Sequence, residues 1–157
     1  MTSFGELYRQ YAPDVFRFAL YLSGERAEAE DLTSETFVRA WTAPEPVRMS
    51  TVKGYLFTIA RNLFLQGRRR TRRQSELVDV HADPGPGPEV RADRDSELRV
   101  VLAALMRLPE IDRAALLMRA GDEMPYEDIA RALGISLASV KVKIHRARLA
   151  LAHIREV

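Results

Sequence analysis

The sequence predicts an all-α fold: two small helical domains joined by a flexible acidic Pro/Gly linker, the second containing a helix-turn-helix. Three observations support this prediction. Apolar residues recur at three- and four-residue spacing along almost the whole chain, which is the period of an α-helix. A proline- and glycine-rich stretch, residues 79–93, interrupts the pattern and has little to bury. Two short helical patterns flank a glycine in the last third, and no stretch is convincing as a β-strand.

The first domain, residues 1–74, is predicted to hold three helices. An apolar stripe at helical spacing covers 7–22 and ends at a Ser-Gly pair. A second stripe covers 26–41 and is stopped by the prolines that follow, because proline lacks an N–H and clashes with the preceding turn. The third helix begins near Val52 and continues into five arginines within residues 68–73. Together these stripes predict a small helical domain.

Residues 75–94 are predicted to form the linker, and residues 95–157 the second domain. Helical patterning resumes near Ser96, breaks at Pro109, and continues in a short helix over 113–119. The helix-turn-helix follows this short helix.

The stretch Pro125–Leu151 carries the helix-turn-helix pattern. Gly134 can take the left-handed conformation that ends the first helix, because it has no Cβ to clash. Ser136 is a suitable N-cap for the second helix, since its hydroxyl can accept a hydrogen bond from an unpaired backbone N–H. The second helix is basic where a recognition helix would meet DNA; the alternative is an ordinary helical hairpin with a solvated basic face. Its apolar seam consists of Leu137, Val140, Ile144, Ala147 and Leu151.

Composition excludes several classes of function. The chain has no cysteine, which excludes a disulfide framework, a thiolate zinc site and a cysteine nucleophile. The N-terminus carries charges where a signal peptide needs an apolar run, and no segment approaches the roughly 20 apolar residues of a spanning helix. The histidines, His81, His145 and His153, form no metal-spaced or triad-like set, and a Gly-rich phosphate loop is absent. We expect an intracellular protein that is not an enzyme and has no cofactor or metal.

The charge is unevenly distributed along the chain. Residues 1–74 hold 12 Arg/Lys and 8 Asp/Glu, residues 75–110 hold 4 and 8, and residues 111–157 hold 8 and 6. Two basic ends therefore flank an acidic middle, which suits a protein that contacts one polyanion at two separate places.

Four segments, in this order, resemble the extracytoplasmic-function sigma factors, the smallest members of the main bacterial sigma family. They are LYRQYAPDVFRFALYLSG, AEAEDLTSETFVRAW, GYLFTIARNLFLQGRRR and LPEIDRAALLMRAGDEMPYEDIARALGISLASVKVKIHRARLAL. The resemblance covers nearly all of the chain outside the linker. It implies a cytoplasmic bacterial protein that binds core RNA polymerase, through the clamp helices and flap region, and directs it to specific promoters.

The resemblance implies that the helix around 30–41 binds the clamp helices of the polymerase. Acidic and basic residues recur there along one face and can make charge-assisted contacts, while two aromatic residues would anchor the helix. A salt-bridged surface with the tryptophan in its own core is the alternative. The expected polymerase contacts are Asp31, Glu35, Phe37, Arg39 and Trp41.

The resemblance implies that the third segment opens the minus-ten element and that the preceding loop, 47–53, receives a flipped base. Opening a duplex needs aromatic or amide groups for an unstacked base and cations for phosphates. Five arginines in six residues, including Arg72 and Arg73, exceed what local acids could neutralise. Phe64 also falls on the apolar stripe, so a core position is the alternative for it. The expected minus-ten contacts are Lys53, Arg61, Asn62, Phe64, Arg68, Arg69 and Arg70.

The resemblance implies that the helix-turn-helix reads the minus-thirty-five element in the major groove. We expect Arg146 and Lys141 to contact guanine edges or flanking phosphates. Val142 replaces a small polar residue frequent in the family, Gln66-Gly67 replaces polar or acidic residues, and Pro125 replaces a hydroxyl cap. These departures affect the promoter sequence that is read. The expected minus-thirty-five contacts are Ser139, Lys141, Val142, Lys143, His145, Arg146 and Arg148.

The resemblance also implies control by an anti-sigma factor that wraps or separates the two domains. The acidic linker would either mimic nucleic acid in a basic channel of the polymerase or act as a passive tether. Two other functions compete with the sigma reading. A stand-alone helix-turn-helix regulator would bind a palindromic operator as a homodimer, and a sigma mimic would sequester a regulator. A stand-alone regulator would have no use for the segment around 30–41 or for the arginine run. A sigma mimic would be expected to lose the basic DNA-contacting residues, which this chain keeps.

Overall fold

Seven α-helices make up almost all of the described chain. The computed structural model describes residues 3–43, 49–77, 93–120 and 124–156. The all-α prediction is confirmed, but the ends of the predicted linker are helical, and residues 78–92 lie outside the described residues. The helices are α1 (Phe4–Ser23), α2 (Arg26–Thr42), α3 (Val52–Leu77), α4 (Asp93–Arg107), α5 (Glu110–Ala120), α6 (Tyr126–Leu133) and α7 (Leu137–Ala152), followed by a short 3₁₀ turn, His153–Glu156.

Helices α1, α2 and α3 pack on one another as an N-terminal bundle. Ser3 begins α1 with a capping box, in which its hydroxyl accepts from the Glu6 N–H and the Glu6 carboxylate accepts from the Ser3 N–H. Gly24 ends the helix in the left-handed conformation, as the Ser-Gly pair predicts. The rings of Phe18 in α1 and Phe57 in α3 are buried and stack with centroids 4.4 Å apart, which joins these two helices.

Helices α4 to α7 form the C-terminal bundle, with α5 against α6 and α7. Its core contains Leu105 of α4, Met118 of α5, Ile129 of α6 and Ile144 of α7, all buried. The guanidinium of Arg113 is also buried and donates to the carbonyls at the end of α4, which stabilises that helix end.

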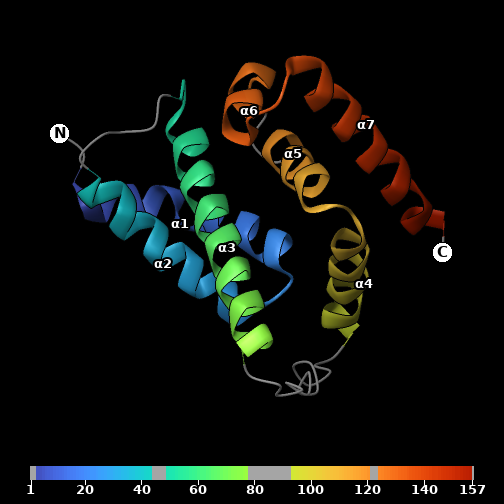
Figure 1. The fold of residues 1–157 in the computed structure, drawn as a ribbon, viewed down its shortest axis with the longest axis horizontal. Coiled ribbons are helices and arrows are strands. Elements are labelled where there is room, and N and C mark those ends of the chain that lie inside the picture. Colours follow the sequence, from blue (N-terminus) through green and yellow to red (C-terminus); the bar gives the residue numbers. More distant parts are fainter. Residues whose placement is uncertain (1–2, 44–48, 78–92, 121–123, 157) are drawn as a thin grey trace.

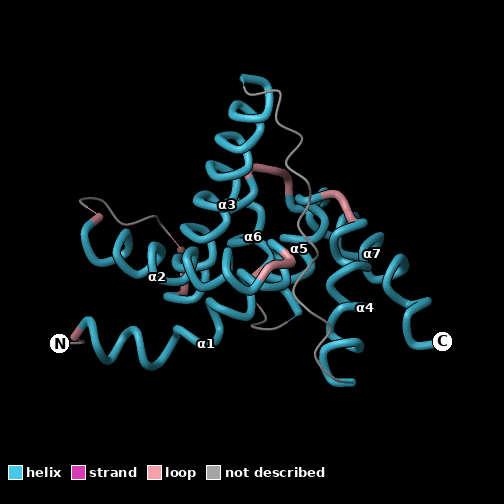
Figure 2. Tube along the Cα trace, turned by 90° about the horizontal axis from the view of Figure 1, so that it is seen from below, coloured by secondary structure: helices cyan, strands magenta, loops and turns pink. Residues whose placement is uncertain are grey.

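The two bundles, which the sequence predicts to be two domains on a tether, pack against each other. Helix α1 contacts α4 and α5, and α3 contacts α5 and α6. Figure 1 shows α5 between α3 and α7, and Figure 2 shows the far end of α3 projecting beyond the other helices. Met124 packs so closely on Gly54 of α3 that a Cβ there would lie 3.2 Å from its terminal methyl. The buried core is therefore continuous across both bundles.

Candidate nucleic-acid interface

The helix-turn-helix is built as the sequence predicts. Gly134 ends α6 in the left-handed conformation with φ 67°, and its N–H bonds to carbonyls of the last turn. Ser136 caps α7, since its hydroxyl accepts from the Ser139 N–H at 3.1 Å. Val140, Ile144 and Ala147 are buried beneath α7. This packing leaves the opposite face of α7 free to enter a groove of DNA.

The exposed face of α7 carries the residues expected to meet the minus-thirty-five element. Val142 has 58% of its surface exposed, which suits contact with a thymine methyl. The ammonium of Lys141 lies 5.7 Å from the ring centroid of Tyr126, and Arg119 covers that ring at 4.3 Å. Ser139 is only partly exposed, and its N–H already bonds to Ser136. The residues exposed on α7 from the predicted set are Lys141, Val142, His145, Arg146 and Arg148, and Lys143 is partly exposed.

Arg146 makes a two-point ion pair with Asp112 of α5. Its Nε donates to Oδ2 at 2.7 Å and its Nη2 donates to Oδ1 at 3.0 Å. The Asp112 side chain is 1% exposed and the Arg146 side chain 58% exposed. The hydrogen bond and the charge of Asp112 raise the pKa of Arg146. No local sequence pattern indicates this pair, because the two residues are 34 positions apart.

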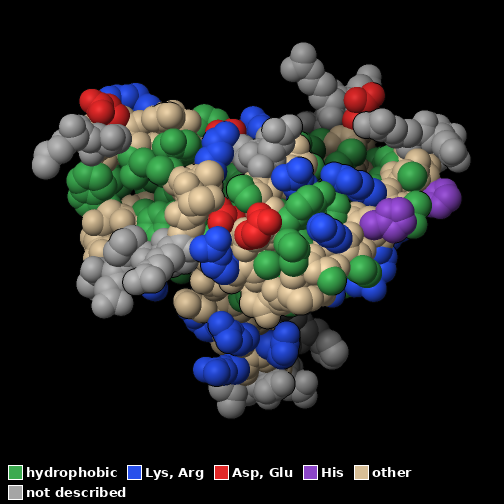
Figure 3. Space-filling model, turned by 90° about the horizontal axis from the view of Figure 1, so that it is seen from above, with side chains coloured by type: hydrophobic (Ala, Val, Ile, Leu, Met, Phe, Trp, Pro, Cys, Tyr) green, Lys and Arg blue, Asp and Glu red, His purple; other side chains and the backbone are tan. Residues whose placement is uncertain are grey.

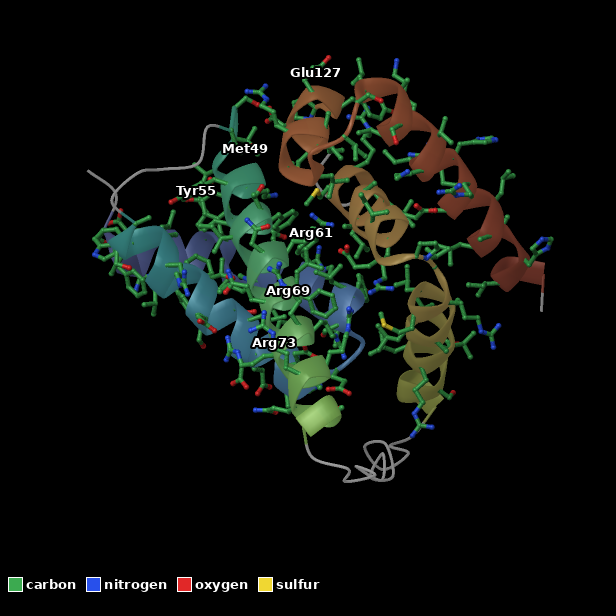
Figure 4. All side chains as sticks on the ribbon, in the orientation of Figure 1. Met49, Tyr55, Arg61, Arg69, Arg73 and Glu127 are labelled. Carbon is green, nitrogen blue, oxygen red and sulfur yellow. The ribbon has the colours of Figure 1, made fainter. Side chains whose placement is uncertain are left out.

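The arginine run lies on the projecting end of α3. Figure 4 shows Arg69 and Arg73 along this part of the helix, and Figure 3 shows blue side chains gathered on the projection. Arg68 bonds to Glu28 at 3.3 Å and covers the ring of Phe64 at 4.8 Å. Within the part of the chain that the structure describes, no acidic side chain pairs with the arginines that follow it. The unpaired, exposed arginines are Arg69, Arg70, Arg72 and Arg73.

Other residues of the expected minus-ten set lie in different environments. Asn62 is exposed on α3. Phe64 is 2% exposed, so it is a core residue and not a surface for an unstacked base; this corrects its expected role. Lys53 pairs with Asp14 at 3.3 Å. The guanidinium of Arg61 is turned toward the C-terminal bundle.

Arg61 of α3 also makes a two-point ion pair, with Glu110 of α5. Its Nε and Nη2 donate to the two carboxylate oxygens of Glu110 at 2.9 and 2.7 Å. Figure 4 shows Arg61 between α3 and α5. The side chains are 10% and 24% exposed, so this arrangement hides Arg61 from DNA.

The loop before α3 is joined to the helix-turn-helix. Ser50 donates to the buried carboxylate of Asp128 from its backbone N–H, at 3.1 Å, and from its hydroxyl. Residues 47 and 48 of the predicted base-receiving loop lie outside the described residues.

Of the five residues of α2 expected to contact the polymerase, four are exposed and one is buried. Asp31, Glu35 and Arg39 are exposed, and the last two lie 4.0 Å apart. Trp41 is 53% exposed, so it is a surface residue and not part of the core. Phe37 is fully buried, which corrects its expected role as a surface anchor.

The structure adds surface residues that the sequence pattern missed. Phe4 is 38% exposed and contacts Trp41 edge to face at 5.5 Å. Tyr8, on the predicted core stripe, is 40% exposed, and Val38 is 56% exposed. The signal that could have found them is the clustering of aromatic residues at the start of α1 and the end of α2.

The described residues contain no group of histidine, aspartate or glutamate side chains arranged to hold a metal ion. His145 and His153 are exposed near the end of the chain, and His81 lies outside the described residues. Among the described helices, none combines the length and the apolar character that crossing a membrane requires.

Comparisons with known proteins agree with this geometry. The family model Sigma-70 region 2 matches residues 7–74, and Sigma-70, region 4 matches residues 98–151. The ECF RNA polymerase sigma factor SigE of Mycolicibacterium smegmatis is 39% identical over 153 residues, covering 94% of this chain and 60% of its own length. The ECF RNA polymerase sigma factor SigM of Bacillus subtilis is 32% identical over 151 residues, covering 91% of this chain and 89% of its own.

A solved structure has the same fold over its whole length. The sigma factor RpoE of Bartonella quintana, in complex with the anti-sigma factor NepR, superposes with a TM-score of 0.79 at 26% identity. The match covers 100% of this chain and 99% of that chain.

Proposed function

The chain belongs to the extracytoplasmic-function sigma factor family, and we propose that it binds core RNA polymerase and directs it to two-element promoters. The observation that carries the proposal is the pair of basic surfaces: the exposed face of α7 and the unpaired arginines on α3. A stand-alone regulator needs only the first. We assign residues 1–74 to polymerase binding and the minus-ten element, 75–94 to a linker, and 95–157 to the minus-thirty-five element.

The arginine run supports a role on single-stranded promoter DNA. Arg69, Arg70 and Arg73, with Gln66, line a groove on α3. Unpaired cations beside an open groove follow a phosphate backbone, and Asn62 supplies a nearby amide for a base. The exposed face of α7 reads duplex DNA in the major groove.

The exposed end of α2 supports polymerase binding. Trp41 and Val38 form an apolar surface beside Asp31 and Glu35. Tryptophan is enriched among the few residues that supply most of the binding energy of a protein interface. The polymerase supplies the catalysis, so this chain acts without catalysing a reaction, in the cytoplasm where the polymerase meets DNA.

With its two bundles packed together, the molecule is too short to contact both promoter elements at once. Elements centred near minus-ten and minus-thirty-five lie about 85 Å apart along B-DNA. A compact body of this length has a radius of gyration of about 15 Å and a diameter of about 40 Å. The 15 residues between α3 and α4 reach about 50 Å when extended, which is enough to let the bundles separate.

This size difference explains how an anti-sigma factor would act on the chain. A partner that binds both bundles together keeps them too close to engage the promoter. The similar Bartonella quintana protein is in complex with an anti-sigma factor, which supports a partner of that kind here.

Run-off transcription with core RNA polymerase tests the proposed function. Templates would be selected from random promoter sequences by the reconstituted holoenzyme. We expect transcripts that depend on this protein and on both promoter elements, and that decrease with Trp41→Ala, because that variant loses the exposed anchor.

The matched control is Val100→Ala, an equally exposed apolar residue on α4, which is expected to transcribe normally. Failure to associate with core polymerase, together with specific binding of a palindromic duplex by the protein alone, would contradict the proposal and favour a stand-alone regulator.

A further inference from the structure

The ion pair between α7 and α5 joins a surface cation to an interior anion. Asp112 is 1% exposed, whereas Arg146 is 58% exposed on the helix that meets DNA. Two parallel bonds, at 2.7 and 3.0 Å, fix the plane of the guanidinium relative to α5. The carboxylate thus acts from below the DNA-facing surface.

The bonding pattern leaves a useful edge of the guanidinium free. Asp112 takes the Nε–H and one Nη2–H of Arg146. The Nη1 hydrogens and the second Nη2 hydrogen remain, and they form the other edge of the planar fork. This Nη1–Nη2 edge can donate two parallel hydrogen bonds to O6 and N7 of a guanine. The ion pair therefore orients Arg146 and leaves it able to bind.

The pairing with Asp112 also makes Arg146 different from the other cations of α7. Among the described residues, Arg146 is the one cation of α7 with an acidic partner; Lys141, Lys143 and Arg148 have none. An unpaired cation attracts any phosphate, whereas a paired one loses part of that nonspecific attraction. A fixed guanidinium also loses less side-chain entropy on binding. Both effects favour a base contact over a phosphate contact.

We propose that Asp112 is a positioning residue for promoter specificity, holding Arg146 with its Nη1–Nη2 edge toward a guanine of the upstream element. This inference rests on the proposed function, because it requires α7 to lie in the major groove. Asp112 itself touches no DNA and acts only through Arg146.

The test measures sequence discrimination by the holoenzyme on promoters with each upstream base pair replaced in turn. Arg146→Ala is expected to reduce discrimination at one G·C pair by about 5- to 150-fold. Asp112→Asn is expected to reduce it at the same pair by a smaller factor and to leave the other positions unchanged. The double variant should discriminate no worse than Arg146→Ala alone, because both changes remove one interaction.

Two further variants separate positioning from stability. Asp112→Glu keeps the charge but displaces the carboxylate, so it should fold and still lose discrimination at that pair. Lys143→Ala, which removes an unpaired cation, should weaken binding to all sequences alike. Thermal melts of each variant would give the fraction of protein that is folded at the temperature of the transcription assay.

Equal loss on every promoter for Asp112→Asn and Asp112→Glu, or unchanged discrimination for both, would overturn the positioning role. Either result, with the unaltered protein still supporting transcription, would leave the proposed function standing. No transcription with the unaltered protein would instead reject the proposed function itself.

Discussion

Glu28 shows how burial and an ion pair oppose each other at one carboxyl group. Burial raises its pKa, and the nearby charges of Glu25 and Asp31 raise it further, while Arg68 at 3.3 Å lowers it. The net pKa lies above the ordinary value of 4.5. The ionised form is therefore less favourable in the folded chain than in the unfolded chain.

We expect Glu28→Gln to stabilise the protein at pH 7 and to lose that advantage in acid. Because the folded state holds the Glu28 proton more tightly, stability of the unaltered protein falls as the pH rises above about 4.5. The glutamine variant lacks this loss. Thermal melts between pH 4 and pH 7 would measure the difference in Tm, with exposed Glu30→Gln as the control. The prediction is contradicted if the Tm of Glu28→Gln, measured against that of the unaltered protein, is lower at pH 7 than at pH 4. That result would show that the ion pair with Arg68 outweighs the cost of burying Glu28.

Among the helices and turns, two glycines have opposite effects on stability: one is required by a turn and the other weakens a helix. Gly134 has φ 67° and joins α6 to α7, a conformation that costs any residue with a Cβ. Gly67 lies within α3, immediately before the arginine run, and an added Cβ there would meet no atom within 4 Å. Although glycine weakens a helix interior, α3 continues past Gly67 to Leu77.

Alanine at these two positions is expected to shift stability in opposite directions. Gly67→Ala should raise the free energy of unfolding by about 0.5–1 kcal/mol, because alanine loses less backbone entropy in a helix. Gly134→Ala should lower it by about 1–2 kcal/mol, because the left-handed turn becomes strained. Urea unfolding followed by circular dichroism would measure both. A loss of stability at both positions would mean that α3 needs the flexibility of Gly67.

At the scale of the whole molecule, polar contacts join the two bundles in addition to their continuous apolar core. Arg61 of α3 pairs with Glu110 of α5, and Ser50 bonds to Asp128 of α6. A buried ion pair adds little net stability, but removing one partner leaves an uncompensated charge that costs about 3–5 kcal/mol. Separation of the bundles would rehydrate Arg61 without unfolding either one. The same motion would expose Arg61, which we propose as a contact to the minus-ten element.

Glu110→Ala is expected to open the molecule. The unpaired Arg61 would favour separated bundles, so the radius of gyration in small-angle X-ray scattering should rise well above the roughly 15 Å of a compact chain. Glu127→Ala, which removes an exposed acid of α6, should leave it unchanged. The exchange Arg61→Glu with Glu110→Arg should restore the compact value. A compact Glu110→Ala protein would show that apolar packing alone keeps the bundles together.

Local sequence patterns predict the helices and several of their ends. Helical spacing of apolar residues, the left-handed glycines at 24 and 134, and the Ser136 cap all act within a few residues, so local patterns predict them. The same ordered segments were enough to place the chain in its family. The division into domains and the contact residues remain predictions that follow from that placement.

Packing between helices, which local patterns do not specify, sets which side of each helix is buried. Phe37 and Phe64 are buried while Trp41 is exposed, because packing between helices selects one face of a broad apolar stripe. The ion pairs of Arg61 and Arg146 join residues 49 and 34 positions apart, and no local pattern specifies them. Such partners meet only when the bundles and helices come together, so the closed arrangement and the oriented arginine are properties of the fold.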